Sequence, residues 1–252
     1  MVTATENPVE QLSAVEENLE DLREDLQDDL NSDEKQTRLT ALAAGIIDET
    51  SARPGDPYAD RDTVGILTLQ CRHINFSNGK ATLSYTGKSD VEQKREVTDK
   101  ALISTLKDAC EGEGPQTEIF QYKGEDGTKS HINGEMLNDY LSDHGFTAKD
   151  IRKYHANELM AETLEDTRKN GPNLSEEDEP EETLKDEFKD ALEEVSNLLG
   201  NEPSTIQSDY LLDGLKETWE SDGKVEKKYS HRQLSKRVAS RYLTNHIHST
   251  IQ

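Results

Sequence analysis

The sequence predicts an α+β protein that is mainly α-helical and contains one small antiparallel β-sheet. Three observations lead to this class. Apolar residues recur every three or four positions along most of the chain, short β-type runs occur only between about residues 66 and 97, and turn-forming residues separate those runs. Helices packed around one small sheet are a common solution for burying apolar faces of both kinds.

The composition leaves two alternatives open, disorder and a folded halophilic protein. Hydrophobic residues make up 31% of the 252 residues and charged residues 33%, and 53 acids against 29 bases give a formal charge of −24. Low hydrophobicity with high net charge is typical of disordered chains. A folded protein of a salt-saturated cytoplasm has the same balance, because molar salt screens its carboxylates. The periodic apolar residues favour the folded, halophilic alternative.

Two acidic helices are expected in residues 1–50. In the first, a continuous apolar face is formed by Leu12, Val15, Leu19, Leu22, Leu26 and Leu30. This face covers fewer than three heptads, so we expect the helix to dock on its own domain and not to form a coiled coil. The second helix is expected to begin after Ser32 as its N-cap. It should end before residues 53–57, which contain two prolines and a glycine.

Short strands are expected next, interrupted by turns at Ser77-Asn78-Gly79 and at Gly87. We place them at residues 66–69, 73–76, 81–85 and 95–97. Helical spacing then returns, and we expect helices at residues 100–110, 134–144 and 148–165, followed by an acidic loop from residue 171 and a last helix that ends at Gly200.

Several functional classes are excluded or disfavoured. The longest apolar runs fall far short of the ~20 residues that cross a bilayer, and the acidic N-terminus lacks a basic signal-peptide region. Cys71 and Cys110 form no C-x-x-C pair, so we expect neither a disulfide framework nor a cysteine zinc site. His246 and His248 are the only close histidine pair. We therefore expect a cytoplasmic protein without metal or cofactor.

The positive charge is concentrated near the C-terminus. From Asp213 onward the chain has eight basic and five acidic residues, a net charge of +3. The preceding 212 residues therefore have a net charge of −27. This asymmetry predicts three regions: acidic helices in residues 1–50, a core in residues 51–212 and a basic tail in residues 213–252. A basic tail on an acidic chain suggests an anionic partner such as nucleic acid, although a solvated helix would have the same composition. The candidate DNA-binding residues are Lys224, Lys227, Lys228, Arg232, Lys236, Arg237 and Arg241.

Common catalytic templates are absent. Gly87-Lys88-Ser89 resembles the end of a phosphate-binding loop, but the required first glycine would fall at Thr82. The G-x-S-x-G motif of hydrolases does not occur. Arg53, Lys88 and Arg152 each stand next to a turn or near the start of a regular element, where an isolated cation is usually a surface residue.

Four segments in order nevertheless resemble one known family. They are residues 52–55 with the following 62–69 (ARPG and DTVGILTL), residues 85–89 (YTGKS), residues 146–154 (FTAKDIRKY), and residues 198–204 (LLGNEPS) with Tyr210 nine positions after Asn201. This series resembles the catalytic domain of type IB DNA topoisomerases of the short bacterial and poxviral kind, whose fold is shared with tyrosine recombinases. The resemblance extends from about residue 17 to about residue 222.

The resemblance implies an activity and a catalytic set. The activity is relaxation of supercoiled double-stranded DNA by a monomer, through transient strand cleavage and a 3′-phosphotyrosyl intermediate, without ATP or metal. The nucleophile would be Tyr210, and two guanidiniums, which stay charged and match phosphate oxygens, would stabilise the transition state. The implied catalytic residues are Arg53, Lys88, Lys149, Arg152, Asn201 and Tyr210, with Lys88 as general acid and Lys149 as a second lysine at the phosphate.

Two departures from the family pattern are visible. Many relatives have histidine at the position of Asn201, and an amide can donate a hydrogen bond but cannot transfer a proton. Relatives also usually have a strand-rich N-terminal domain, whereas about fifty helical residues precede Arg53. The chain is therefore either a catalytic fragment or a protein that clamps DNA differently.

Two alternatives remain. A tyrosine recombinase would share the fold, the nucleophile and the two arginines, but recombinases typically have H-x-x-R where this chain has Lys149-Asp150-Ile151-Arg152. A non-catalytic DNA-binding protein would have no need of Tyr210.

Overall fold

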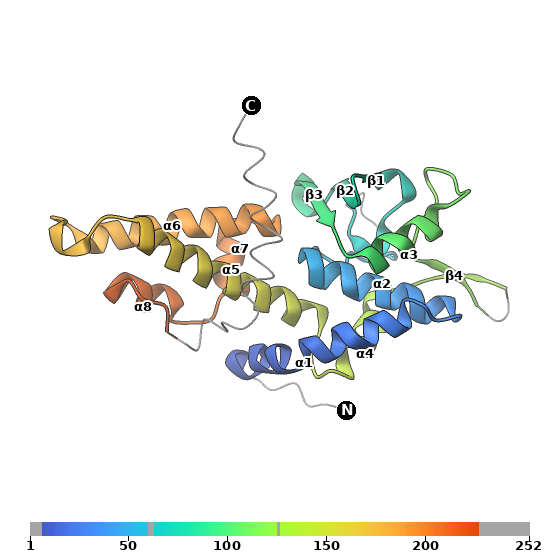
Figure 1. The fold of residues 1–252 in the computed structure, drawn as a ribbon, viewed down its shortest axis with the longest axis horizontal. Coiled ribbons are helices and arrows are strands. Elements are labelled where there is room, and N and C mark those ends of the chain that lie inside the picture. The colour runs from blue at the N-terminus through green and yellow to red at the C-terminus, as the bar shows by residue number, and fades with distance from the viewer. Residues whose placement is uncertain (1–6, 60–62, 125–126, 227–252) are drawn as a thin grey trace. The chain divides into compact units, whose positions relative to one another are not determined.

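The computed structural model describes residues 7–59, 63–124 and 127–226 (Figure 1). The α-helices are α1 (Pro8–Asp29), α2 (Lys35–Thr50), α3 (Lys100–Cys110), α4 (Gly134–Ser142), α5 (Ala148–Asn170), α6 (Pro180–Leu199), α7 (Pro203–Asp209) and α8 (Leu215–Asp222). The strands are β1 (Ile74–Ser77), β2 (Lys80–Thr86), β3 (Glu92–Val97), β4 (Gln121–Lys123) and β5 (Lys129–His131). The prediction of a mainly helical α+β protein with a small antiparallel sheet is confirmed.

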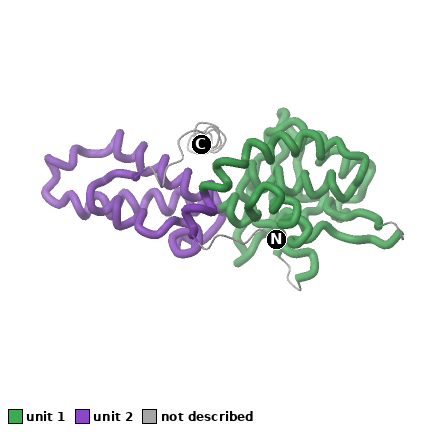
Figure 2. Tube along the Cα trace, turned by 90° about the horizontal axis from the view of Figure 1, so that it is seen from below, with its two compact units in different colours: residues 1–4, 13–152 green, residues 5–12, 153–252 purple. Residues whose placement is uncertain are grey.

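Two compact units divide the chain (Figure 2). Of the described residues, one unit contains 13–59, 63–124 and 127–152, and the other contains 7–12 and 153–226. We call them unit 1 and unit 2. The boundary at Arg152 lies inside α5, so this helix belongs to both. The three-part division into residues 1–50, 51–212 and 213–252, which rests on composition, stays a prediction.

The first helix buries the apolar face that the sequence predicts. All six of its residues from Leu12 to Leu30 are at most 4% exposed. An ion pair joins α1 to α2: Arg23 donates from Nε and Nη2 to the two carboxylate oxygens of Asp48, at 2.8 and 3.0 Å. Docking of this helix on the body of the protein is therefore confirmed.

Unit 1 contains the three-stranded sheet, in the antiparallel order β1-β2-β3. Leu83 in the central strand pairs with Ile74 on one side and Arg95 on the other. The tight β1–β2 turn uses Asn78 and Gly79, both with positive φ, as asparagine–glycine hairpins do. The strands expected near residues 73–76, 81–85 and 95–97 are confirmed. A second hairpin of β4 and β5 was not predicted, since each strand has only three residues.

Two expected local structures are wrong. Residues 66–69 do not form a strand. Ile66–Thr68 is a short 3-10 helix, because the N–H groups of Ile66 and Leu67 donate to the carbonyls of Arg53 and Pro54 at 3.0 and 2.7 Å. The second correction concerns Ser32, which is not the N-cap of α2. The helix begins at Lys35 with Glu34 as its N-cap residue.

The two cysteines are also corrected, because Cys71 and Cys110 form a disulfide with a Cα–Cα distance of 5.6 Å. They are 39 residues apart, so their spacing gave no local signal. Cys71 lies in a one-turn 3-10 helix just before β1, whereas Cys110 is the last residue of α3. Tertiary packing between these two elements brings the sulfur atoms together.

Unit 2 is helical. The middle of α5, residues 154–161, is buried on all sides, although it contains polar residues such as His155, Asn157 and Glu158. Helix α8 docks on α6 through Trp219, whose indole N–H donates to the carbonyl of Leu184 at 3.0 Å. Gly200, with φ of +62°, ends α6 where the sequence predicts.

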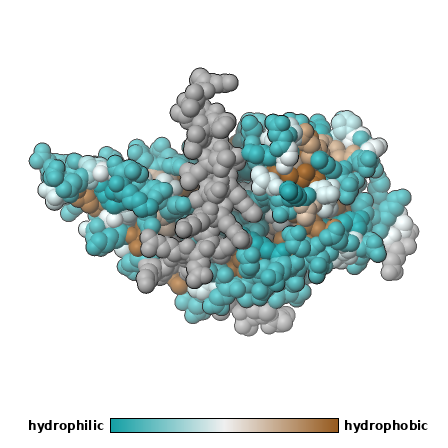
Figure 3. All heavy atoms as spheres, in the orientation of Figure 1, coloured by the Kyte–Doolittle hydropathy of each residue, from teal (hydrophilic) through white to brown (hydrophobic). Residues whose placement is uncertain are grey.

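The face of the molecule seen in Figure 3 agrees with the polar composition. Hydrophilic residues cover most of the face seen in Figure 3. Within the described ranges, every helix is too short or too polar to be a candidate for crossing a bilayer.

Candidate active site

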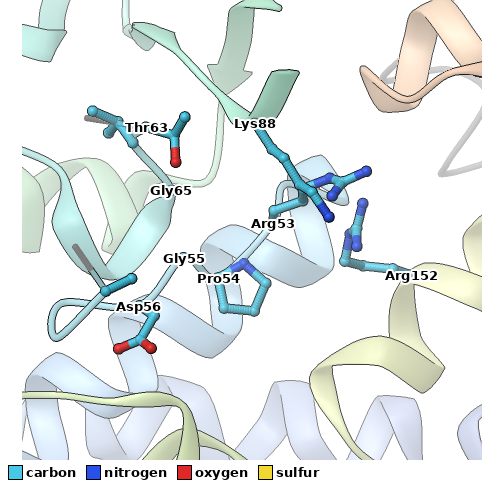
Figure 4. A pocket seen from close by; sticks show the side chains of 10 residues that line it. Arg53, Pro54, Gly55, Asp56, Thr63, Gly65, Lys88 and Arg152 are labelled. Carbon is cyan, nitrogen blue, oxygen red and sulfur yellow. The ribbon is translucent and has the colours of Figure 1, made fainter. Parts of the chain in front are cut away.

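Unit 1 contains a cavity of about 470 Å³ into which three cationic side chains converge. Figure 4 shows the side chains of Arg53, Lys88 and Arg152 pointing toward one another, whereas Asp56 lies on the other side of Pro54. The cavity is lined by Arg53, Pro54, Gly55, Asp56, Ala59, Thr63, Val64, Gly65, Lys88 and Arg152. We call this the cationic pocket.

Arg53 is positioned by the turn after α2. The helix ends in a left-handed residue, Ser51 (φ 53°), whose N–H donates to the carbonyl of Ile47, and the chain then leaves the helix axis. The carbonyls of Arg53 and Pro54 accept the N–H groups of the 3-10 helix that starts at Ile66. Backbone hydrogen bonds therefore hold the chain just before Arg53, at Ser51, and at Arg53 and Pro54 themselves.

Two glycines allow this segment to lie directly against the next one. A Cβ atom added to Gly65 would lie 2.5 Å from the nitrogen of Gly55, and one added to Gly55 would lie 2.9 Å from the Cα of Gly65. Gly55 also has φ of +76°, which disfavours any side chain. The glycines in the ARPG and TVG segments therefore let two backbones touch at the wall of the pocket.

Lys88 follows β2 in the connection to β3. The N–H of Gly87 donates to the carbonyl of Val91 at 2.9 Å, which closes this connection into a tight loop. The N–H of Val64 donates to the carbonyl of Thr86 at 3.0 Å and joins the same loop to the pocket wall. Lys88 is exposed to solvent at the tip, where it can approach a ligand that enters the pocket.

Arg152 comes from the first turns of α5 and is only 5% exposed. Its Nε donates to the carbonyl of Ser51 at 2.7 Å. This bond joins residues 101 positions apart and explains why Arg152 lies next to Arg53, since Ser51 precedes Arg53 by two residues. One edge of the guanidinium is held by protein, which fixes the direction of the rest of the group.

The positive potential of this region also affects Tyr85 in β2. Burial raises the pKa of Tyr85, while the positive charges of Arg95, Arg152 and Arg53 act in the opposite direction. The hydroxyl of a buried tyrosine thus lies within the field of three guanidiniums. In the sequence, Tyr85 stands out only as part of the family segment 85–89, and nothing in its local pattern distinguishes it from a packed aromatic residue.

The structure does not place all six predicted catalytic residues in the cationic pocket. Lys149 is exposed on α5, three residues before Arg152, and is not among the lining residues. Asn201 and Tyr210 belong to unit 2. Asn201 directly follows the left-handed Gly200, its N–H donates to the carbonyl of Ser196 at 3.0 Å, and it is 9% exposed.

Tyr210 is the residue at which α7 ends. Its N–H still donates to the carbonyl of Ile206 at 3.1 Å, and its side chain is 6% exposed. Asn157 of α5 bonds the backbone at and just after Tyr210, through the carbonyl of Tyr210 and the N–H of Leu212. A lone asparagine inside a helix gives no sequence signal for such a role.

Of the predicted DNA-binding residues, Lys224 is described and is exposed after α8. Six others lie outside the described residues: Lys227, Lys228, Arg232, Lys236, Arg237 and Arg241. His246 and His248 lie outside them as well. In the described part of the chain, no cluster of three or more His, Cys, Asp or Glu side chains is arranged to hold a metal ion.

The chemistry of the cationic pocket suits an anion with several oxygens. Two planar guanidiniums and one ammonium provide forked and single donors, and Asp56 is the one carboxylate among the lining residues. Guanidiniums at fixed positions can bind non-bridging phosphate oxygens bidentately, and they remain charged at every physiological pH.

Comparison with known proteins finds one family along nearly the whole chain. Residues 6–242 match the family described as eukaryotic DNA topoisomerase I, catalytic core. A curated relative, the DNA topoisomerase 1B of Acanthamoeba polyphaga mimivirus, is 29% identical over 147 residues. That alignment covers 54% of this chain and 43% of the viral protein, so the match spans less than half the length of the relative.

Among solved structures, the chain is similar to the XerH site-specific recombinase. In a post-cleavage complex with palindromic difH substrate, the match has a TM-score of 0.46 and 16% identity, and covers 80% of this chain and 50% of the recombinase. In a pre-cleavage complex with difH substrate, the TM-score is 0.42 and the identity 14%, with 86% and 53% covered.

Proposed function

The chain belongs to the DNA topoisomerase I catalytic-core family, and from this premise we propose that it relaxes supercoiled double-stranded DNA as a type IB enzyme. The observation that supports this most strongly is the cationic pocket. Three family segments, far apart in the sequence, contribute Arg53, Lys88 and Arg152 to one cavity of about 470 Å³. The cavity has room for a phosphodiester group, and its three cations suit the charge of such a group.

In the proposed reaction, the hydroxyl of Tyr210 loses its proton to solvent water and its oxygen attacks the phosphorus of one DNA strand. The new tyrosine–phosphorus bond forms as the bond to the 5′ oxygen breaks, which leaves the DNA attached through its 3′ phosphate. The departing 5′ oxygen takes a proton from Lys88 and becomes a hydroxyl. After the nicked duplex rotates, that hydroxyl attacks the phosphotyrosine and reverses both bond changes.

The other residues act on the charge that develops at phosphorus. Arg53 and Arg152 stabilise the non-bridging oxygens, which gain charge in the transition state. Lys149 assists at the same phosphate, and Asn201 donates a neutral hydrogen bond where many relatives use histidine. A free tyrosine with a pKa near 10 is only ~0.1% ionised at pH 7, so these positive groups are needed to promote attack.

We predict that the enzyme relaxes both positive and negative supercoils without nucleotide or divalent metal. The energy of the cleaved bond is retained in the tyrosyl ester, so resealing needs no external energy source. The measurement is relaxation of plasmids of either sign in EDTA, without ATP, followed on agarose gels. A strict requirement for ATP or Mg²⁺ would contradict the proposal.

A second prediction concerns salt and follows from the −27 charge of residues 1–212. We propose that this charge is a halophilic adaptation of a cytoplasmic, monomeric enzyme. DNA binding normally weakens as salt rises, with a log–log slope of about −0.9 per phosphate contacted. Here salt also screens repulsion between the acidic body and DNA, and relieves repulsion within the fold. We therefore expect relaxation activity to rise with KCl to an optimum well above physiological ionic strength.

Removal of the basic tail gives a variant that tests this salt prediction. Truncation after Gly223 removes Lys224 and the six predicted DNA-binding residues beyond it. We expect the truncated protein to bind DNA more weakly than the full chain, with the largest difference on the high-salt side. If full-chain activity fell steadily from ~0.1 M KCl upward at constant helical content, the acidic surface would not be a halophilic adaptation.

A further inference from the structure

The residue Asn157 is not part of the catalytic set, yet it bonds the backbone at Tyr210 and two residues further on, at Leu212. Its amide nitrogen donates to the carbonyl of Tyr210 at 2.8 Å, and its amide oxygen accepts the N–H of Leu212 at 3.0 Å. Both bonds are buried, and Asn157 itself is 1% exposed. The nitrogen also donates to the carbonyl of Lys153, one helical turn earlier, at 2.8 Å.

These bonds occur where the chain has few regular constraints. Helix α7 is seven residues long and ends at Tyr210, and α8 does not begin until Leu215. Between these helices, residues 210–214 belong to no helix or strand, although the N–H groups of Tyr210 and Leu211 still donate to the carbonyl of Ile206. The side chain of Asn157 therefore acts as a fixed partner from the middle of α5, where residues 154–161 are all buried.

Asparagine suits this position better than its close analogues. One end of an amide donates and the other accepts, which matches one carbonyl and one N–H of the bonded backbone. An aspartate would offer two acceptors and would face the carbonyl of Tyr210 with a repelling oxygen. An alanine would leave a buried carbonyl and a buried N–H without these bonds.

We propose that Asn157 is a positioning residue for the nucleophile: it fixes the backbone of residues 210–212 and thereby the direction of the Tyr210 hydroxyl. The inference rests on the proposed function, because it gives Tyr210 the role of nucleophile. A displacement of about 1 Å at a reacting group can reduce a rate about 100-fold. Loss of the Asn157 bonds should therefore slow strand cleavage while non-covalent DNA binding changes little.

The test compares Asn157→Asp and Asn157→Ala with the unaltered enzyme in single-turnover cleavage of a labelled duplex, from pH 5 to pH 8. We expect both variants to cleave about 10- to 100-fold more slowly at pH 8. As the pH falls, the new carboxyl of Asn157→Asp becomes protonated, and its burial favours this neutral form. A carboxylic acid keeps an acceptor and one of the amide's two donors, so it can again bond the Leu212 N–H and the Tyr210 carbonyl, and the ratio of its rate to the unaltered rate should rise. The ratio for Asn157→Ala should stay constant.

Asn170→Asp is the matched control. Asn170 lies on the same helix and donates to the carbonyl of Asp166, one turn earlier, but it is exposed near the end of α5. Its rate ratio should stay near one at every pH. Helical content and affinity for an uncleavable duplex, measured for each variant, separate slow chemistry from loss of fold.

The outcomes distinguish the two hypotheses. If the unaltered enzyme forms no covalent adduct, the proposed function fails and this inference with it. If it forms the adduct and both Asn157 variants cleave at its rate, or Asn157→Asp shows the flat ratio of Asn157→Ala, only the inference is overturned.

Hydrogen exchange of the unaltered protein adds a test that needs no variant. The Leu212 amide should exchange at least about tenfold more slowly than in an unstructured peptide, and exchange at the peptide rate would contradict the proposal.

Discussion

Replacement of Tyr210 by phenylalanine is expected to abolish the covalent protein–DNA adduct, a loss of at least about 10⁴-fold in cleavage rate. The substitution removes one oxygen atom, which is the proposed nucleophile, and leaves the ring that packs in unit 2. Tyr210 is 6% exposed, so the surface available to DNA changes little. Affinity for uncleaved duplex should therefore remain nearly intact, which a filter-binding or anisotropy titration measures.

Tyr122→Phe is the control for this prediction. It removes the same atom from a partly exposed tyrosine in β4, outside the lining of the cationic pocket. The control should form the adduct at the unaltered rate. An adduct formed by Tyr210→Phe on denaturing gels would mean that another residue is the nucleophile.

Replacement of either arginine of the cationic pocket by alanine is expected to cause the second large loss of cleavage rate. Loss of one preorganised donor to a developing charge typically costs about 10²- to 10³-fold in rate. We expect Arg53→Ala and Arg152→Ala each to slow single-turnover cleavage by that factor, and the double variant by less than the product, because the two groups act on one phosphate. The readout is the cleavage rate constant at saturating enzyme.

The two arginines should differ in one respect. Arg152 also donates to the carbonyl of Ser51, so its replacement loosens the turn that positions Arg53. Arg152→Ala should therefore lower the thermal midpoint of unfolding, whereas Arg53→Ala should change it less. Arg72→Ala, in an exposed residue outside the pocket lining, should leave both cleavage and stability unchanged. Cleavage at the unaltered rate by both pocket variants would exclude the cationic pocket as the phosphate site.

The long helices could be predicted from the sequence because each has an apolar face with regular spacing. The face from Leu12 to Leu30 is buried as expected, and Gly200 ends α6 as a left-handed residue. The hairpin at Asn78-Gly79 was predictable for a similar reason, since the turn chemistry is local. In each case the residues that decide the structure are close together in the sequence.

The wrong expectations concern structure that depends on distant partners. The Ile66–Thr68 segment has the composition of a strand, but the carbonyls of Arg53 and Pro54 accept its N–H groups and turn it into a 3-10 helix. The disulfide between Cys71 and Cys110 likewise depends on how α3 packs near the start of β1. Neither contact leaves a pattern in neighbouring residues.

The candidate site also combines residues that local sequence patterns predict with contacts between distant residues that they do not. Arg53, Lys88 and Arg152 could be nominated from the family segments, but their meeting in one pocket depends on the Arg152–Ser51 bond across 101 residues. Asn157 had no sequence signal at all, because its partners are the backbone groups of Tyr210 and Leu212 and not side chains. Backbone partners of this kind become visible only in three dimensions.

The central claim, type IB chemistry at Tyr210, is tested most directly by mapping the covalent adduct. A nicked or truncated duplex that traps the cleaved strand is labelled at its 5′ or its 3′ end in separate reactions, and the adduct is digested and analysed by mass spectrometry. The account predicts that the 5′-labelled fragment stays with the protein, attached through its 3′ phosphate to a peptide that contains Tyr210. Attachment through a 5′ phosphate, or to a peptide without Tyr210, would contradict it.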